Sequence, residues 1–148
     1  MVSESKAVRE ILFRGKLEDN GNWIVGSFHK SINDCYIIPL PVVTSKSKVI
    51  PETVGQFTGL TDKNGKKIFE GDIFQMDDES VAVVIFKDGC FRLEEYFFSG
   101  VYTESGFDEC GGEWGVVNCD PIDWYFTKDM EVIGNIHDNP ELLEGHDG

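Results

Sequence analysis

The run from Val54 to Asp72 (VGQFTGLTDKNGKKIFEGD) constrains the fold of this chain more than any other segment. Glycines recur at positions 55, 59, 65 and 71, and each costs a helix interior about 1 kcal/mol relative to alanine, so a helix is disfavoured. Asp62 can bond the backbone two residues on, and Asn64-Gly65 tolerates positive φ. The run therefore predicts strands around a turn, and with it an all-β protein.

A strand pair and one further short strand are predicted before this run. A strand over 9–16 and its return over 23–29 form a hairpin around Gly21, which is free to adopt positive φ. A short strand over 35–39 ends at prolines, which cannot donate to a ladder. These segments together predict an N-terminal β-meander.

The segment Ser80–Lys87 (SVAVVIFK) gives the clearest strand pattern in the second half. Both of its faces are apolar, which predicts a strand covered on both sides. Asp88-Gly89 then predicts a two-residue hairpin turn into a strand over 90–96. Closing strands are predicted over 122–126 and 130–136, and Asn139-Pro140 predicts one short C-terminal helical turn.

The length of 148 residues fits one domain. We expect a small SH3-like open barrel or rolled antiparallel sheet. A loose N-terminus is predicted over 1–8 and the meander over 9–50. The barrel-like part is predicted over 51–143, with an inserted glycine-rich loop over 97–121.

Charge is distributed unevenly along the chain. The net charge is −14, with +3 over residues 1–69 and −17 over residues 70–148. Nucleic-acid binding relies on cationic side chains, so the acidity disfavours direct contact with nucleic acid, with the modestly basic first half as the one reservation. The opposite charges of the halves also suggest self-association. No apolar run approaches the ~20 residues of a membrane span, and no signal peptide opens the chain, so we expect a cytoplasmic protein.

No residue pattern indicates a metal or cofactor site. Asp62-x-Asn64-Gly65 resembles the start of a calcium loop, but Ile73 stands where that loop needs a bidentate Glu. Asp77-Asp78-Glu79 is interpreted as a solvated turn. Cys90, Cys110 and Cys119 have the wrong spacing for a zinc site. These three and Cys35 are expected to be reduced thiols.

No catalytic residue is predicted either. Nucleophilic catalysis needs a Ser or Cys beside an oriented base, and none of His29, His137 and His146 lies in a nucleophile signature. A small metal-dependent hydrolase stays open as an alternative. It would require a pocket with a perturbed carboxylate or thiol beside His29 or His137.

The segment 97–126 holds eight of the eighteen aromatic residues. Four of them, Phe97, Phe98, Trp124 and Phe126, are interpreted as core residues. Aromatic side chains inside a charged rim resemble binding hot spots in composition. The candidate binding residues are Tyr102, Phe107, Trp114, Glu104, Asp108, Glu109 and Glu113.

Three stretches, REILFRGK (9–16), PETVGQFTGLTDKNGKKIFEGDI (51–73) and EVIGNIHDNPELL (131–143), resemble in order and spacing the YopX family of bacteriophage and prophage proteins. The resemblance implies an all-β protein made in a bacterial cytoplasm, and it implies no catalytic residues because the family has no assigned biochemical function. The segment 97–121 departs from the three motifs.

The leading hypothesis is a non-enzymatic accessory protein that binds an unidentified host or phage protein through its acidic, aromatic second half. One alternative is an acidic imitation of the DNA backbone that occupies a host DNA-binding enzyme. The metal-dependent hydrolase is the other.

Overall fold

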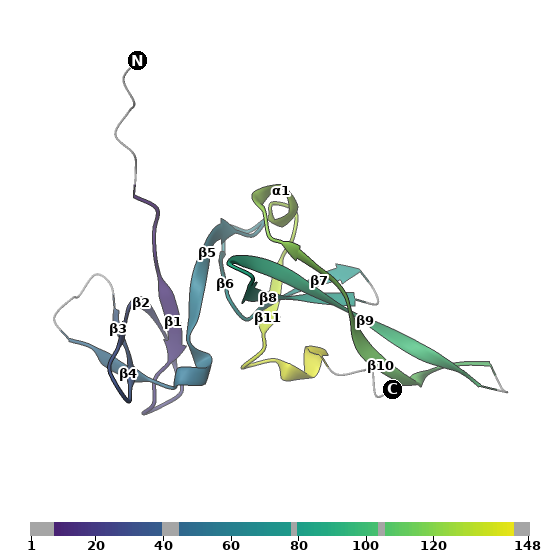
Figure 1. Ribbon diagram of the computed structural model, residues 1–148, viewed down its shortest axis with the longest axis horizontal. Coiled ribbons are helices and arrows are strands. Elements are labelled where there is room, and N and C mark those ends of the chain that lie inside the picture. Colours follow the sequence, from purple (N-terminus) through teal and green to yellow (C-terminus); the bar gives the residue numbers. More distant parts are fainter. Residues whose placement is uncertain (1–7, 40–44, 78–79, 104–105, 144–148) are drawn as a thin grey trace, which may run out of the picture. The chain divides into compact units, whose positions relative to one another are not determined.

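The computed structural model describes residues 8–39, 45–77, 80–103 and 106–143. The named strands form two antiparallel sheets, which confirms the predicted all-β class (Figure 1). Neither sheet closes into a barrel over the described residues. The chain divides into a first unit, Met1–Gly59, and a second unit, Leu60–Gly148. None of the helices in the described ranges is long and apolar enough to cross a membrane.

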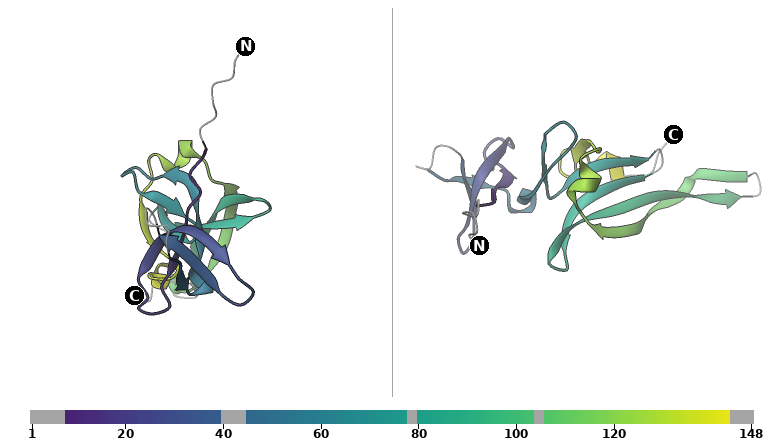
Figure 2. Two further views of the ribbon diagram at one scale, coloured as in Figure 1. Left: turned by 90° about the vertical axis from the view of Figure 1, so that its left-hand side faces the viewer. Right: turned by 90° about the horizontal axis from the view of Figure 1, so that it is seen from above.

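The first unit is built on a four-stranded meander followed by a turn of 3-10 helix and a fifth strand (Figure 2, left). Its elements are β1 (Phe13–Lys16), β2 (Trp23–Lys30), β3 (Cys35–Pro39), β4 (Ser47–Val49), η1 (Pro51–Thr53) and β5 (Gly55–Thr61). The sheet order β4-β3-β2-β1-β5-β6 confirms the predicted meander. The first strand is shorter than predicted, because it begins at Phe13 and not at Arg9.

One face of this meander forms the core of the first unit. Strand alternation sends every second side chain to the same face. The buried residues there are Cys35, Ile37 and Val49, and the partly buried residues around them are Phe13, Leu17, Ile24, Phe28 and Val54. The alternate residues of each strand point to the opposite face of the sheet.

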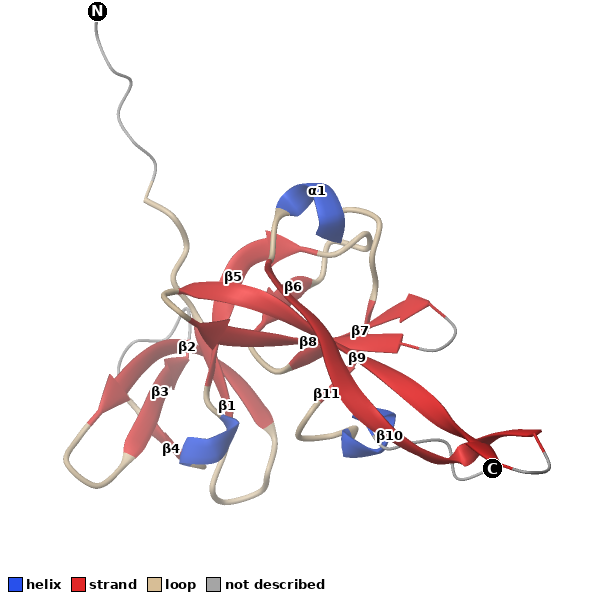
Figure 3. Ribbon diagram, turned by 45° about the vertical axis from the view of Figure 1, so that its right-hand side comes forward, coloured by secondary structure: helices blue, strands red, loops and turns tan. Residues whose placement is uncertain are grey.

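The second unit contains a five-stranded sheet in the order β10-β9-β8-β7-β11 (Figure 3). Its elements are β6 (Lys67–Phe69), β7 (Asp72–Asp77), β8 (Ser80–Lys87), β9 (Cys90–Thr103), β10 (Gly106–Pro121), α1 (Trp124–Thr127), β11 (Val132–Asn135) and η2 (Pro140–Leu143). The predicted two-residue hairpin turn between β8 and β9 is confirmed: Asp88 and Gly89 have φ values of 54° and 81°. Such values suit the primed turns that match strand twist.

Strand β8 is covered on both faces, as its sequence predicts. Val81 and Val83 lie in one buried cluster with Ile73, and Ala82 and Val84 lie in another. The first cluster is covered by Leu142 and Leu143 of η2, so the C-terminal helical turn and its packing through two leucines are confirmed.

Two predicted elements differ from the structure. The segment 97–121, expected as a loop, lies almost entirely in the paired strands β9 and β10. The segment 122–126, expected as a strand, contains the start of helix α1. Asp123 caps this helix, since its Oδ1 accepts a hydrogen bond from the Phe126 amide at 2.9 Å, and this N-cap outweighs the β propensity of the aromatic residues that follow.

Candidate functional site

Strands β9 and β10 form a two-stranded ribbon that extends past the rest of the second sheet (Figure 2, right). Ser80 opposite Phe97 is the last pair between β8 and β9. Beyond it, in the described part of the chain, β9 pairs only with β10. The ribbon therefore has a base inside the sheet and an outer part, residues 98–114, that presents two strand edges. Unpaired strand edges are ready templates for another chain.

The outer part of the ribbon brings predicted binding residues to opposite positions. Tyr102 lies opposite Phe107, and Trp114 lies opposite Phe98. The ladder thus places these four positions in paired strands where the sequence predicted a loop.

The predicted acidic residues are distributed along the same ribbon. Asp108 and Glu113 flank a register shift in β10, and Glu109 falls within it. Glu104 lies outside the described residues. Residues 93–127, named here the acidic segment, contain eight Asp or Glu and no Lys or Arg. The charged side chains of the segment itself are therefore all negative, although two neighbouring cations contact it: Arg92 Nη1 donates to the Cys119 carbonyl at 3.0 Å, and Lys128 Nζ lies over the Trp124 ring.

Exposed aromatic side chains lie near the base of the ribbon. Trp124 is 59% exposed, Phe86 is 54% exposed and Phe126 is 37% exposed. The interpretation of Trp124 and Phe126 as core residues is therefore wrong: the cap at Asp123 turns this stretch into a helix and leaves its aromatic residues in solvent. The position of Lys128 Nζ, 5.4 Å from the Trp124 ring centroid, is that of a cation–π contact.

Sequence reasoning missed Phe86 as a surface residue. It packs edge-on against Phe91 with ring centroids 5.1 Å apart. The Ile122 amide donates to the Phe91 carbonyl at 3.1 Å, so this pair borders the chain that leads into α1. The sequence did contain a signal for this exposure, because Phe86 lies two residues before the Asp88-Gly89 turn. Strand ends at hairpin tips have fewer neighbours than strand centres.

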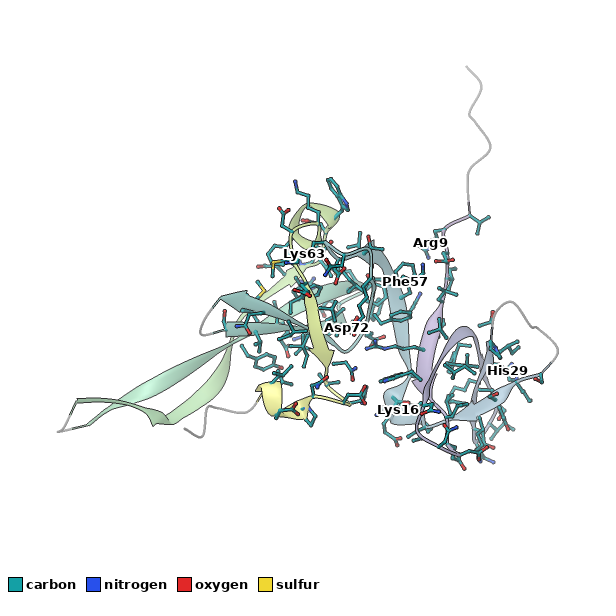
Figure 4. The ribbon with its side chains drawn as sticks, turned by 180° about the vertical axis from the view of Figure 1, so that it is seen from behind. Arg9, Lys16, His29, Phe57, Lys63 and Asp72 are labelled. Carbon is teal, nitrogen blue, oxygen red and sulfur yellow. The ribbon has the colours of Figure 1, made fainter. Side chains whose placement is uncertain are left out.

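Asp62, in the turn that follows β5, joins this turn to the edge strand β11 through its carboxylate. The neighbouring residue Lys63 is labelled in Figure 4. Asp62 is only 5% exposed. Its Oδ1 accepts from the amides of Asn64 at 2.8 Å and Lys66 at 3.0 Å, and its Oδ2 accepts from the Val132 amide at 3.1 Å. The predicted Asx-type turn is confirmed.

The acid strength of Asp62 follows from this geometry. Burial raises the pKa of its carboxyl group, but the hydrogen bonds from the Val132, Lys66 and Asn64 amides and the charge of Lys66 outweigh burial, so the pKa lies below the ordinary value. Lys63 Nζ lies 3.6 Å from Glu131 Oε2, and the Lys63 amide donates to the Met130 carbonyl at 2.9 Å. These contacts assign Asp62 a structural role.

A second polar cluster holds the chain after β11. Asn135 Oδ1 accepts from the amides of His137 at 3.0 Å and Asp138 at 2.9 Å, and Asn139 Oδ1 accepts from the Asn135 amide at 3.2 Å. A Cβ at Gly134 would lie 2.5 Å from Asn139 Oδ1, so only glycine fits there without displacement. The resembling stretch 131–143 thus forms a turn that positions η2.

Metal-ligating groups do not gather in the described part of the chain. No group of three or more His, Cys, Asp or Glu side chains in these ranges is arranged to hold a metal ion. Cys35, Cys90 and Cys119 are free thiols.

The first sheet has an outer face opposite its core. Its residues, placed there by alternation and register, are Arg14, Lys16, Trp23, Val25, Ser27, His29, Tyr36, Ile38 and Lys48. None of these is acidic. Lys16 and His29 are labelled in Figure 4.

Cations lie over both large aromatic rings of the outer face. Arg14 Cζ lies 4.7 Å from the Trp23 ring centroid and Lys16 Nζ lies 5.4 Å from it. Lys46, next to β4, places its Nζ 4.2 Å from the Tyr36 ring centroid. Each pair is within the distance at which the ring quadrupole attracts a cation.

Comparison with known proteins identifies the relatives of this chain. The family profile described as "YopX protein" matches residues 13–144. Among curated proteins, none matches the chain. The crystal structure of protein EF1440 from Enterococcus faecalis is similar, with 25% sequence identity and a TM-score of 0.50 over 93% of this chain and 100% of that chain. Since the profile spans nearly the whole sequence, including every named strand of the described ranges, the chain belongs to the YopX family.

Proposed function

We propose that the chain is a phage- or prophage-encoded accessory protein that acts by binding another protein, in the cytoplasm of a bacterial host. The proposed binding surface consists of the acidic segment together with Phe86 at the base of the ribbon. The partner is expected to offer a basic surface with apolar pockets. No catalytic step is part of this proposal.

The single observation that carries the proposal is the exposure of Trp124 in a segment whose thirty-five residues include eight Asp or Glu and no Lys or Arg. Lys128, the first residue beyond this segment, holds one cation over the Trp124 ring. Tryptophan is among the residues most enriched at interface hot spots, and charged side chains commonly form the rim around such anchors. Phe86 and Phe126 add exposed aromatic area, and the ribbon adds open strand edges. An aromatic anchor with acidic neighbours suits a protein partner better than a small ligand.

Affinity capture with two matched variants tests this proposal. Wild-type protein, Trp124→Ala and Ile133→Ala are each expressed with the same tag in infected or induced bacteria, and the captured proteins are quantified. Ile133 is a suitable control because it is a large apolar residue of the same unit, 38% exposed, on β11. Truncation of a hot-spot residue typically costs 2 kcal/mol or more, a factor of about 30 in affinity.

The expected result is one or more proteins enriched by wild type and by Ile133→Ala and depleted with Trp124→Ala. Capture at low and moderate salt separates the charge contribution, because contacts between exposed charges weaken as ionic strength rises. Capture of the same proteins by Trp124→Ala at undiminished levels would contradict the proposed surface.

A further inference from the structure

The outer face of the first sheet has a composition unlike that of the acidic segment. We propose that this face binds the acidic segment of a second copy of the chain, so that copies associate head to tail. The inference rests on the proposed function, because it uses the same acidic segment as a protein-binding element. It adds a partner whose chemistry is known from the sequence.

The outer face offers paired cations and aromatic rings in fixed positions. Lys16 lies against Trp23 and Lys46 lies against Tyr36. Arg14 also lies against Trp23 but is buried, with 8% of its surface exposed, so Lys16 and Lys46 are the cations that a partner would meet. Cations held over rings lose less side-chain freedom on binding than extended, mobile side chains, and ordering costs oppose association. The face also includes Val25, which is 40% exposed. It therefore combines apolar area with positive charge.

Acidic groups beside the outer face are already paired with a cation. Lys48 Nζ lies 3.1 Å from Asp34 Oδ1 and 3.5 Å from Glu18 Oε2. The pKa of Lys48 is raised by its hydrogen bond and Coulomb attraction to Asp34, and then by Glu18. The negative charge of both carboxylates is thus partly offset locally, and the strand positions of the face carry no acid of their own.

The complementary surface is present on every copy. The first unit carries a net charge of +1 and the second unit −15, and the acidic segment carries −8 without any cation. Three of the eight acidic residues of this segment, Asp108, Glu109 and Glu113, lie at described positions of the outer part of the ribbon. At physiological ionic strength the screening length is about 8 Å, so local complementarity at the contact outweighs the repulsion between distant charges.

Single-stranded nucleic acid is the competing occupant for a face with lysines and aromatic rings. Bases stack on open rings, whereas the rings of Trp23 and Tyr36 already lie against cations. A phosphate chain carries charge along its whole length, whereas a second copy carries its negative charge mainly in one unit. The second copy is therefore the occupant that fits the observations better.

Head-to-tail contact joins two different surfaces, so a pair of copies retains one free face and one free segment. Such heterologous contacts build open chains or rings, in contrast to two-fold dimers that bury the same patch twice. The difference between these two modes of association can be tested with variants of each surface.

Three doubly substituted full-length variants carry the test. The face variant is Lys16→Glu with Lys46→Glu, and the segment variant is Glu109→Lys with Glu113→Lys. The control variant, Lys30→Glu with Lys87→Glu, has the same change of net charge as the face variant at two exposed positions outside both surfaces. Sedimentation velocity at about 50 mM and about 500 mM salt measures association over a range of protein concentrations.

Wild type and the control variant are expected to show a sedimentation coefficient that rises with concentration at the lower salt and rises less at the higher salt. The face variant and the segment variant alone are each expected to associate at least tenfold more weakly, because two attractive contacts become repulsive. In an equimolar mixture of these two variants, the intact face meets the intact segment, and the reversed face and the reversed segment are again opposite in charge, so association is expected to be restored.

Wild-type protein that stays monomeric at the lower salt would overturn the inference, as would a mixture of the two variants that forms no dimer. Fluorescence anisotropy with a labelled oligothymidylate of about twenty nucleotides is the second arm. Binding of this oligonucleotide by wild type and its loss in the face variant would assign the face to nucleic acid instead. Capture of a partner that depends on Trp124, together with absent self-association, would contradict this inference and leave the proposed function standing.

Discussion

Replacement of Asp62 by alanine is the sharpest test of how the second unit is held together. One carboxylate there accepts three backbone hydrogen bonds, from Asn64 and Lys66 in its own turn and from Val132 on β11. Removing it leaves the Val132 amide buried without its acceptor. The bond to that amide spans 70 positions in sequence, so its loss detaches an edge strand from a turn.

The magnitude follows from the number of bonds and their burial. A hydrogen bond to a charged group contributes roughly 1.5–3 kcal/mol, and a neutral or solvent-accessible one about 0.5–1.5 kcal/mol. The Val132 bond is buried and the other two are partly buried. We expect Asp62→Ala to lower the free energy of unfolding by about 3–4 kcal/mol, and Asp62→Asn by about 2–3 kcal/mol, because the asparagine amide keeps one acceptor but turns a donor towards Val132.

Urea denaturation followed by circular dichroism measures the loss, and hydrogen exchange of the Val132 amide localises it. Asp129→Ala is the matched control, since Asp129 is an exposed carboxylate in the same unit, and surface substitutions usually change stability by less than about 0.5 kcal/mol. Destabilisation by Asp62→Ala of less than about 1 kcal/mol, or unchanged protection of the Val132 amide, would refute the assigned role.

Acid sensitivity provides an independent check on the same residue. The folded-state pKa of Asp62 is lowered, so the folded state binds fewer protons than the unfolded state in the acid range. Its stabilising contribution is complete above the unfolded value of about 3.9 and is lost as the pH falls through the folded pKa. Asp62→Asn should therefore flatten the acid limb of the stability profile, and a profile as steep as that of wild type would contradict the pKa direction.

Three further outcomes are expected. Burial, and then the hydrogen bond and charge of Glu94, raise the pKa of Tyr96 to about 12. Ultraviolet titration of wild type should therefore show a phenol that ionises at high pH, and Tyr96→Phe should remove it. A titration curve unchanged by the substitution would be inconsistent with this pKa. Gly134→Ala should lower stability by about 1–3 kcal/mol, because its Cβ meets the side chain of Asn139, and a neutral effect in thermal unfolding would count against that packing. Replacing residues 99–113 by Asn-Gly should leave the melting temperature nearly unchanged, because the described residues of this range pair only across the ribbon. Collapse of the fold would show that the ribbon supports the core.

The strand pattern was predictable wherever burial imposed a clear alternation. Ser80–Lys87 is apolar on both faces because both are covered, and the turn at Asp62 follows from local side-chain chemistry that needs no knowledge of the rest of the chain. What the sequence did not reveal is the bond from Asp62 to Val132, since the partner lies 70 positions away.

The ribbon and helix α1 were harder to predict for a different reason. The described residues of 98–114 pair only across the ribbon, so no third strand imposes an alternation on their sequence, and their glycines suggested a loop. Trp124 and Phe126 were assigned to the core on hydrophobicity alone. The signal that contradicts that assignment is Asp123, an N-cap residue that begins a helix and leaves both rings exposed.

The proposed protein-binding role is tested most directly by comparing the proteins captured by the full chain with those captured by the variant in which Asn-Gly replaces residues 99–113. Both are expressed at equal levels in infected or induced cells, and both are first checked for the same melting temperature. The account predicts at least one protein, rich in basic surface, that the full chain retains and the shortened chain loses. Identical captured sets from the two would contradict it.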